Sequence, residues 1–358
     1  MLKTFMNLPS QGGVEGKVST VEMNNLRFGY TAESSVIEDL SLTITNGQAH
    51  ALMGASGTGK TTLLNLLSGL LEPAKGTIIF DGVDVTKLSA HERNVTQVFQ
   101  FPVLYEALTV EENLLFALRN RNELDRQARD RVAQIVDELS LVEVLHAKPR
   151  VLDLYQKQLV CVAKSVVRAR TSLVLLDEPL TAVDPGRKWQ LRQVLSRMQR
   201  ELNLTMIYVT HDQTEALSFA DRVSVLTEEG IAQTGTPQEI YEAPLTPYVG
   251  HFVGSPGMNF IAGHRFGYPE AVIGFRPEWA TLTEFGAQNA QLEGQVGERC
   301  FLGTKDRVDQ GLTYVATEYG ELAVEGPLRQ GQVLGVSVSR FVRYENEKLK
   351  EVVNVPTT

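Results

Sequence analysis

Alternating and continuous hydrophobic segments predict several β-strands in this chain. Leu26, Phe28 and Tyr30 alternate with more polar neighbours, which indicates a strand with one buried face. Residues 173–176 and 205–210 are instead mostly apolar runs. Such runs are typical of central strands that are buried on both faces. We therefore expect a sheet whose middle strands are fully buried.

Helical periodicity occurs between these strands. Within residues 123–139, apolar side chains recur at the spacing of one helix face, at Val132, Ile135, Val136 and Leu139. A short apolar run over residues 49–53 is followed by a second helical pattern over residues 61–67. Because strands alternate with helices over residues 18–235, the chain is expected to form an α/β fold with a mostly parallel sheet.

The hydrophobic pattern changes after Gly235. Prolines are frequent just beyond this residue, and short alternating segments then recur over residues 271–275, 292–296, 312–316 and 333–338. This spacing predicts a small all-β domain, either a barrel or a sandwich. We expect three parts in the chain, namely a flexible leader over residues 1–17, an α/β domain over 18–240 and a β-domain over 241–358.

Composition and charge narrow the functional classes. Of the 358 residues, 43% are hydrophobic and 22% are charged, as in a globular protein with a substantial core. The formal net charge of −9 argues against a general nucleic-acid-binding protein, which needs a surplus of Lys and Arg. The two cysteines, Cys161 and Cys300, predict neither a disulfide framework nor a Cys-x-x-Cys metal site, and they suit a reducing cytosol. No segment reaches the roughly 20 consecutive apolar residues of a membrane helix.

A glycine-rich motif predicts a phosphate-binding loop. Residues 54–61 read Gly-Ala-Ser-Gly-Thr-Gly-Lys-Thr and match the pattern G-x-x-x-x-G-K-[ST]. Glycines permit the positive φ angles that curl successive N–H groups into a nest for an anion, and the following helix adds further N–H donors. We expect Lys60 to reach the β- and γ-phosphates and the Thr61 hydroxyl to bind Mg²⁺. The predicted nucleotide-binding residues of this loop are Gly54, Ala55, Ser56, Gly57, Thr58, Gly59, Lys60, Thr61 and Thr62.

An acidic pair follows the apolar run at residues 173–176. Asp177 lies at the carboxyl end of this predicted strand, where it can hold the Mg²⁺ of a bound nucleotide. Glu178 can orient or deprotonate the attacking water, a role worth about 10²–10⁴ in rate. An apolar run that ends in Asp-Glu is common by itself. Together with the phosphate-binding loop upstream, it predicts a nucleoside triphosphatase.

Further motifs resemble those of the ATP-binding subunits of ABC transporters. Residues 177–184 (Asp-Glu-Pro-Leu-Thr-Ala-Val-Asp) are similar to the Walker B motif and D-loop of that family. Residues 98–100 are similar to its Q-loop, and residues 209–212 to its H-loop. The resemblance implies that ATP is the nucleotide, that Gln100 contacts Mg²⁺ and the attacking water, and that His211 contacts the γ-phosphate. The implied catalytic residues are Glu178, His211 and Gln100, and the implied Mg²⁺ ligands are Thr61, Gln100 and Asp177.

Adenine requires a flat apolar surface on which to stack. Tyr30 is placed like the adenine-stacking aromatic residue of the family, with Phe28 as the alternative. Packing on the face of a strand explains the same two aromatic rings without a ligand.

The resemblance continues beyond the nucleotide-binding motifs. Residues 235–241, 252–260 and the Gly-Phe-Arg-Pro-Glu segment at 274–278 are similar to the carbohydrate-importer branch of the family. That branch implies a P-loop ABC ATPase core with a mostly parallel sheet, a helical subdomain at about residues 100–170 and an antiparallel β edge. A small all-β regulatory barrel of the OB or TOBE type follows this core.

The signature motif of the family, LSGGQ, is degenerate in this chain. The helix pattern aligns Leu-Asp-Leu-Tyr-Gln at residues 152–156 with the signature, and a second register at 154–158 fits less well. Neither contains the Ser or the glycine pair that lets backbone approach a phosphate. In the first register Asp153 would face a triphosphate, with like charges opposed. Since each ATP in such dimers lies between one P-loop and the opposite signature, we expect a heterodimer with a second ATPase whose signature is intact.

These motifs together imply an ATP-hydrolysing subunit at the cytoplasmic face of the membrane. It would energise an ABC importer for a small carbohydrate or polyol, such as a sugar, glycerol or glycerol phosphate. The implied partners are two transmembrane permease subunits docked near residues 100–118 and, indirectly, a solute-binding protein. Two alternatives stay open: an ATP-binding but hydrolytically weak regulatory partner in the heterodimer, and a soluble ABC-type ATPase outside transport. The soluble class typically carries two cassettes or a long coiled-coil arm, and neither is visible in the sequence.

Overall fold

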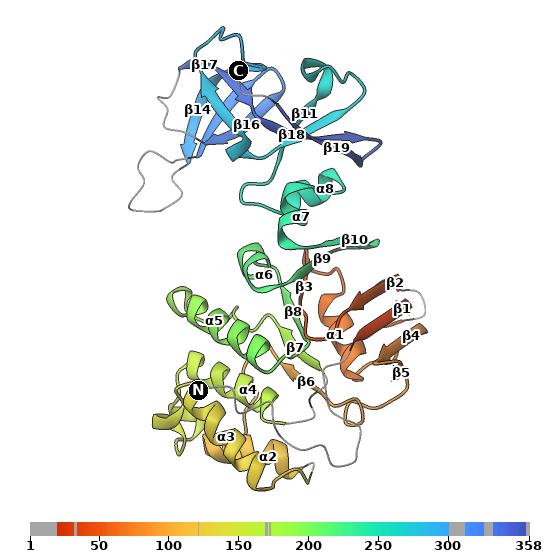
Figure 1. The fold of residues 1–358 in the computed structure, drawn as a ribbon, viewed down its shortest axis with the longest axis vertical. Helices are drawn as coiled ribbons and strands as arrows, with labels where there is room; N and C mark the ends of the chain where they lie inside the picture. Colours follow the sequence, from red (N-terminus) through yellow and green to blue (C-terminus); the bar gives the residue numbers. More distant parts are fainter. Residues whose placement is uncertain are drawn as a thin grey trace. The chain divides into compact units, whose positions relative to one another are not determined.

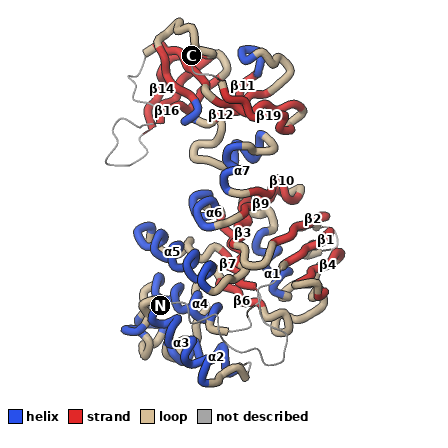
Figure 2. Tube along the Cα trace, viewed as in Figure 1, coloured by secondary structure: helices blue, strands red, loops and turns tan. Residues whose placement is uncertain are grey.

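The computed structural model describes residues 20–31, 34–120, 122–168, 171, 173–300, 312–325 and 332–355, with the backbone only for 298–300 and 312. The expected leader over residues 1–17 and the Cys300 side chain lie outside this description. The chain divides into two compact units, Met1–Ile231 and Ala232–Thr358. Helices, blue in Figure 2, are concentrated in the first unit, whereas strands, red, predominate in the second.

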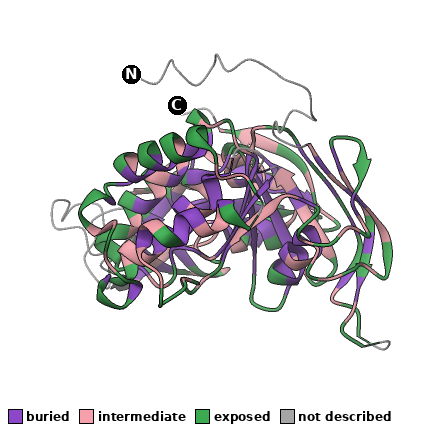
Figure 3. Ribbon diagram, turned by 90° about the horizontal axis from the view of Figure 1, so that it is seen from below, coloured by how far each residue is buried: buried purple, intermediate pink, exposed green. Residues whose placement is uncertain are grey.

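A six-stranded sheet forms the centre of the first unit. Its strands are β3 (Ala49–Gly54), β6 (Val95–Val98), β7 (Leu173–Asp177), β8 (Met206–Thr210), β9 (Arg222–Thr227) and β10 (Gly230–Gly235). They have the order β10-β9-β3-β8-β7-β6, and neighbours from β9 to β6 are parallel. Every residue of β3, β7 and β8 is buried, and buried segments (purple) fill the middle of Figure 3. The expectation of a mostly parallel sheet with buried middle strands is therefore confirmed.

An antiparallel sheet lies beside this central sheet. Its strands are β1 (Val21–Phe28), β2 (Ile37–Ile44), β4 (Lys75–Phe80) and β5 (Val83–Asp84), in the order β2-β1-β4-β5. Leu26 and Ile44 of this sheet share one hydrophobic cluster with Leu52 of β3 and with Leu63 and Leu66 of the helix that follows it. The shared core joins the two sheets around the glycine-rich loop.

The helices of the first unit are α1 (Lys60–Ser68), α2 (Val110–Arg119), α3 (Arg126–Glu138), α4 (Leu154–Val166), α5 (Pro185–Glu201) and α6 (Gln213–Phe219), with 3-10 turns η2 (Val142–Val144) and η3 (Pro149–Val151). Figure 1 shows α2, α3 and α4 gathered beyond the β6 end of the sheet. Val132, Ile135 and Val136 form the buried face of α3, as their spacing predicts. Cys161 is buried on α4. Among the described residues, none of the helices combines the length and hydrophobicity needed to span a bilayer.

The division between the units falls within β10, and the second unit then has two short helices, α7 (Pro237–Glu242) and α8 (Pro247–Phe252). Two antiparallel sheets follow. One has the order β11-β12-β18-β19 and consists of β11 (Asn259–Ala262), β12 (Val272–Phe275), β18 (Arg340–Glu345) and β19 (Lys348–Asn354). The other has the order β13-β17-β14-β15-β16 and consists of β13 (Ala280–Thr283), β17 (Val333–Val338), β14 (Leu292–Cys300), β15 (Leu312–Thr317) and β16 (Gly320–Glu325). The 3-10 turns η4 (Gly263–Phe266) and η5 (Pro277–Trp279) connect strands of this unit.

The Gly-Phe-Arg-Pro-Glu segment has a structural role in the second unit. Arg276 is completely buried, and its guanidinium donates to the backbone carbonyls of Tyr241, Gly250 and Val253. It also stacks over the ring of Tyr241, 4.1 Å from the centroid. Since a buried guanidinium is stable only when its donors are satisfied, this arginine fixes α7 and α8 against the first strands of the sheets.

Candidate nucleotide-binding and catalytic site

Loops at one edge of the central sheet carry the predicted site residues. Gly54 ends β3, Asp177 ends β7 and His211 directly follows β8. In the strand register, Asp177 pairs with Val209 of β8, and β8 pairs with β3 on its other side. Because neighbouring parallel strands end at the same edge of a sheet, these loops meet there, at the usual ligand edge of an open α/β fold.

The loop between β3 and α1 has the backbone geometry of an anion nest. Gly57 and Gly59 have φ angles of +89° and +86°, in the left-handed region that glycine adopts without strain. Gly59 is also the N-cap of α1, and within the described part of the chain no side chain caps this helix and no acidic residue lies in its first turn. The N–H groups and the positive end of the helix dipole are therefore available to a phosphate.

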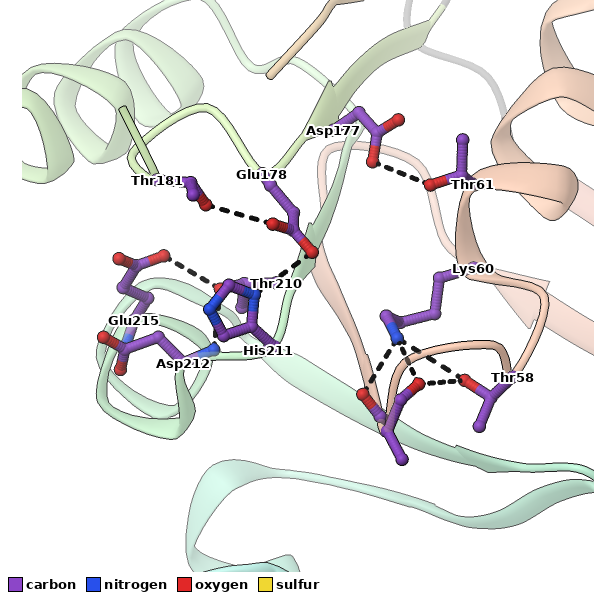
Figure 4. Close-up of polar contacts among 12 residues, drawn as sticks. Thr58, Lys60, Thr61, Asp177, Glu178, Thr181, Thr210, His211, Asp212 and Glu215 are labelled. Carbon is purple, nitrogen blue, oxygen red and sulfur yellow. Dashed lines mark hydrogen bonds and ion pairs between the residues drawn. The ribbon is translucent and has the colours of Figure 1, made fainter. Parts of the chain in front are cut away.

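The Lys60 side chain lies across this loop. Its ammonium donates to the carbonyl oxygens of Gly54 at 2.8 Å and Ala55 at 2.7 Å, and it lies 3.5 Å from the Thr58 hydroxyl (Figure 4). Burial lowers the pKa of Lys60, while the nearby acidic pair acts in the opposite direction. A phosphate in the nest would likewise favour the charged form of this lysine.

Thr61 and Asp177 form a pair of oxygen ligands. The Thr61 hydroxyl donates to Oδ1 of Asp177 at 3.2 Å, and burial raises the pKa of this carboxyl. A carboxylate and a hydroxyl fit Mg²⁺, which prefers oxygen ligands and completes its shell with water and substrate phosphates. Gln100, the third predicted ligand, follows β6 at the same sheet edge. In the described structure it makes no hydrogen bond to either partner, so only two of the three predicted ligands are in contact.

Glu178 and His211 face each other across the ends of β7 and β8. Nδ1 of His211 lies 3.1 Å from Oε1 of Glu178, and the Thr181 hydroxyl donates to Oε2 at 3.1 Å. Glu178 has a φ of +46°, a strained value for a non-glycine residue, and its N–H is held by the Val209 carbonyl at 3.0 Å. Figure 4 shows the Glu178 and His211 side chains pointing toward each other. The structure thus brings two of the three predicted catalytic residues into direct contact.

Tyr30 lies beside the first turn of α1. Its hydroxyl is 3.1 Å from the Thr62 hydroxyl, and 62% of the residue is exposed. A cavity of about 550 Å³ beside the ring is lined by Tyr30, Ala74 and Lys75, among other residues. Phe28 is 9% exposed and packs in the core, but it also lines this cavity, so the choice between Tyr30 and Phe28 for adenine stays a prediction. Tyr30 has an accessible face, whereas Phe28 supports it edge-to-face at 5.1 Å.

The N-terminus of α4 is closed by an acidic cap. The Asp153 carboxylate accepts from the Gln156 N–H at 2.7 Å, and the Gln156 side chain accepts from the Asp153 N–H at 3.0 Å. Arg187 pairs with the other Asp153 oxygen at 2.6 Å and stacks over the Tyr155 ring. The Gln156 N–H bond, together with Arg187, holds the pKa of Asp153 below its ordinary value, so a negative charge occupies this helix end.

Sequence reasoning missed Thr181 and Arg187. Thr181 lies inside the 177–184 motif, and a hydroxyl three residues after an acidic side chain was the available signal. Arg187 is outside every motif and is 34 residues from Asp153, so the sequence contains no local signal for their contact.

Comparison with known proteins gives consistent matches. Residues 37–181 match the family model described as ABC transporter. The sn-glycerol-3-phosphate import ATP-binding protein UgpC of Brucella abortus (strain 2308) is 37% identical over 284 residues, which cover 76% of this chain and 81% of that protein. The oligosaccharides import ATP-binding protein MsmX of Bacillus subtilis (strain 168) is 30% identical over 330 residues, which cover 92% and 89%. The solved structure of cbiO1 from Clostridium perfringens, described as part of the ABC transporter complex cbiONQ, superposes with a TM-score of 0.58 at 26% identity, over 63% of this chain and 91% of that one.

Proposed function

Because the chain belongs to the ABC transporter ATP-binding family, whose members are ATPases, we propose that it energises an importer for a small carbohydrate or polyol from the cytoplasmic face of the membrane. The names of two relatives refer to import of sn-glycerol 3-phosphate and of oligosaccharides, which supports this substrate class. The observation that carries the proposal is one sheet edge where Lys60, the Thr61–Asp177 pair and the Glu178–His211 pair come together.

The N-terminus of α1, which no side chain caps in the described structure, is the proposed binding site for the phosphates of the nucleotide. The glycine nest and Lys60 bind the β- and γ-phosphates, because both supply donors or positive charge to the same concave loop. Tyr30 offers its exposed ring to adenine, and its bond to Thr62 fixes the ring at the side of the phosphate loop. Thr61 and Asp177 would hold Mg²⁺, with Gln100 as a further ligand. When bound, Mg²⁺ supplies neutralisation of the phosphate charge.

Hydrolysis uses the facing pair at the ends of β7 and β8. The Glu178 carboxylate accepts the proton of the water that attacks the γ-phosphorus, while the bond to the bridging oxygen of ADP breaks. His211 donates to the γ-phosphate and, through its contact with Glu178, orients that carboxylate. The strained backbone at Glu178 supports this role, since such strain is concentrated at functional sites.

A groove beside the helical segment suits a permease partner. It has a volume of about 340 Å³ and is lined by Phe99, Val103, Tyr105, Phe116 and Lys164, among others. Phe101 and Val103 are strongly exposed for apolar residues. Exposed apolar groups around a concave surface are typical of protein interaction sites. One of two permease subunits docks here, near residues 100–118, and the permease pair receives a solute-binding protein on its other side.

The acidic cap of α4 supports a mixed pair of ATPases. A homodimer would present the Asp153 carboxylate to the triphosphate at both composite sites, with like charges opposed. Pairing with a second ATPase whose signature is intact leaves one composite site with this chain's P-loop fully functional. The site that uses this chain's α4 is then the weak one, which also accounts for a partly regulatory role.

Uptake measurements test the proposed function directly. Cells whose chromosomal copy carries Lys60→Ala are expected to lose most uptake of one radiolabelled sugar, glycerol or glycerol phosphate, because the phosphate-binding charge is removed. Lys87→Ala, at an exposed lysine of the same unit, is the matched control and should leave uptake unchanged. Normal uptake of every carbohydrate and polyol in the Lys60→Ala strain would contradict the proposal.

A further inference from the structure

A buried carboxylate lies behind the Glu178–His211 pair. Glu215, on α6, is only 3% exposed. Its Oε2 accepts hydrogen bonds from the Tyr208 hydroxyl at 2.8 Å and the Thr210 hydroxyl at 2.9 Å, and its Oε1 accepts from the Lys188 ammonium at 3.2 Å. Three donors on one buried carboxylate satisfy most of its acceptor capacity, which is the condition for burying such a charge.

This network holds the backbone on both sides of His211. Thr210, which precedes the histidine, donates its hydroxyl to Glu215 and accepts the N–H of Asp212 at 3.0 Å. Asp212, which follows the histidine, accepts the Glu215 N–H at 3.1 Å through its carboxylate. Figure 4 shows Glu215 and Asp212 on the side of His211 away from Lys60, with Thr210 beside the histidine ring. Both neighbours of the histidine are therefore tied directly or indirectly to one buried side chain.

The network also reaches α5. Lys188 lies in the first turn of this helix, which begins at Pro185, immediately after the 177–184 motif. Its partner Glu215 has a side chain that is 4% exposed, so solvent screens this ion pair less than a surface pair. The helix that follows the acidic motif and the loop that carries the histidine are thereby joined through one carboxylate.

We propose that Glu215 is a positioning residue that holds His211 against Glu178, and that Lys188 links this element to α5. This inference rests on the proposed roles of Glu178 and His211 in hydrolysis. The carboxylate is too deeply buried to contact ATP or the attacking water itself, so its effect on the reaction passes through the histidine. Burial raises the pKa of Tyr208 well above its ordinary value, and Glu215 adds to this, so the phenol stays a donor.

The kinetic test separates positioning from general structural support. In the full chain assembled with its second ATPase and permeases, Glu215→Ala is expected to lower kcat by about a hundredfold, as small misplacements of catalytic groups do. The KM for ATP should change by less than about threefold, because Glu215 itself contacts no nucleotide and the P-loop contacts stay intact. In a His211→Ala background, Glu215→Ala should add no further loss, since residues that act through one another are not additive.

Glu215→Gln and Lys188→Met keep the test decisive if Glu215→Ala does not fold. The glutamine retains acceptance from the Tyr208 and Thr210 hydroxyls but loses the ion pair, so an intermediate loss in kcat is expected for both variants. Glu239→Ala is the matched control, because Glu239 occupies the same third position of a helix in the second unit. It should leave kcat unchanged.

Imidazole NMR signals of His211 give a readout that does not depend on hydrolysis. In the nucleotide-free full chain, assigned with the His211→Ala variant, these signals should move in Glu215→Ala and Glu215→Gln and stay unchanged in Glu239→Ala. Unmoved signals, or kcat losses that simply add to the loss in His211→Ala, would overturn the proposal. If Glu178→Gln and His211→Ala themselves leave hydrolysis intact, the proposed catalytic roles fail instead, and the NMR result still decides on the positioning of His211.

Discussion

The N-termini of α1 and α4, both in the first unit, differ in whether a negatively charged side chain caps them. At α1 the cap is Gly59, and in the described structure no side chain makes a capping hydrogen bond to this helix end. At α4 the cap is Asp153, whose carboxylate accepts the Gln156 N–H and forms an ion pair with Arg187. Both ends carry the same positive helix dipole. What differs is whether the chain itself supplies the anion.

The difference shows how one residue decides whether a helix end binds a ligand. An acidic or hydroxyl cap stabilises a helix by about 0.5–2 kcal/mol, and a glycine cap gives up only part of this. At α1 the remaining donors stay available for a phosphate, because Gly59 contributes no side chain. At α4 the cap accepts one of the helix N–H donors, that of Gln156, and places a negative charge where another anion would have to enter. The first end favours ligand binding, and the second favours the stability of the free chain.

The largest expected effect is on the rate of ATP hydrolysis at Glu178, near the uncapped N-terminus of α1. Glu178→Gln removes the proton acceptor but keeps the size of the side chain, so hydrolysis should fall by about 10²–10⁴. Nucleotide affinity should be retained, because the α1 nest and Lys60 are intact. Steady-state hydrolysis and an ATP titration of the same sample measure both, with Glu143→Gln on the exposed turn η2 as the control. Undiminished hydrolysis would contradict the role of Glu178.

A smaller effect, on the affinity for ATP, is expected at Tyr30, the predicted adenine-stacking residue. Tyr30→Ala should weaken ATP binding by about tenfold, since an aromatic stacking pair contributes about 0.5–1.5 kcal/mol beyond its buried area. Tyr30→Phe keeps the ring and loses only the contact with Thr62, so its affinity should remain near that of the unmodified chain. Equal losses in both variants would show that the hydroxyl matters and that the ring does not stack. Isothermal titration with ATP separates the two results.

The N-terminus of α4 should accept a phosphate more readily when the charge of its Asp153 cap is removed. Asp153→Ser keeps a good helix cap but leaves no carboxylate for Arg187, so hydrolysis by the chain alone should rise by about two- to fivefold. The gain is modest because the glycine pair of the signature is still missing. Asp125→Ser, at the N-cap of α3, makes the same chemical change where no phosphate is expected, and its activity should not move. A fall in activity for Asp153→Ser would contradict the account of the α4 N-terminus.

The smallest effect is on stability. Burial raises the folded-state pKa of Asp177 above its ordinary value of 3.8, so the ionised carboxyl destabilises the fold at neutral pH. This penalty is complete above the raised pKa and disappears as the pH falls toward 3.8. Asp177→Asn should therefore raise Tm by about 2–4 °C near pH 7 and give no gain in Tm below pH 3.8. A lower Tm at pH 7, measured by calorimetry without Mg²⁺, would contradict the sign.

The sequence predicted the residues around the N-terminus of α1 much better than the contacts around the N-terminus of α4. Lys60, Thr61, Asp177 and Glu178 lie in short motifs next to buried apolar strands, and parallel strands carry such motifs to one sheet edge regardless of the loops between them. The same motifs predicted the fold class and the ATPase family, and the comparisons with known proteins confirm both.

Contacts between distant loops could not be predicted in this way. The bond between Tyr30 and Thr62 joins residues 32 apart, and that between Arg187 and Asp153 joins residues 34 apart. Glu215 follows Asp212 at the spacing of a helix cap, which explains its position in the sequence but not its bond to Thr210. Tertiary packing decides such contacts, because the side chains involved have several local partners of similar energy.

The most direct test of the contrast between the two helix ends is the rate of ATP hydrolysis by the purified full chain, measured against ATP concentration before and after addition of the second ATPase that we propose as its partner. We expect slow, hyperbolic hydrolysis by the chain alone and a large increase when the second ATPase supplies an uncharged signature helix. Fast, sigmoidal hydrolysis by the chain alone would show that two α4 ends capped by Asp153 can serve a triphosphate, and it would contradict the account.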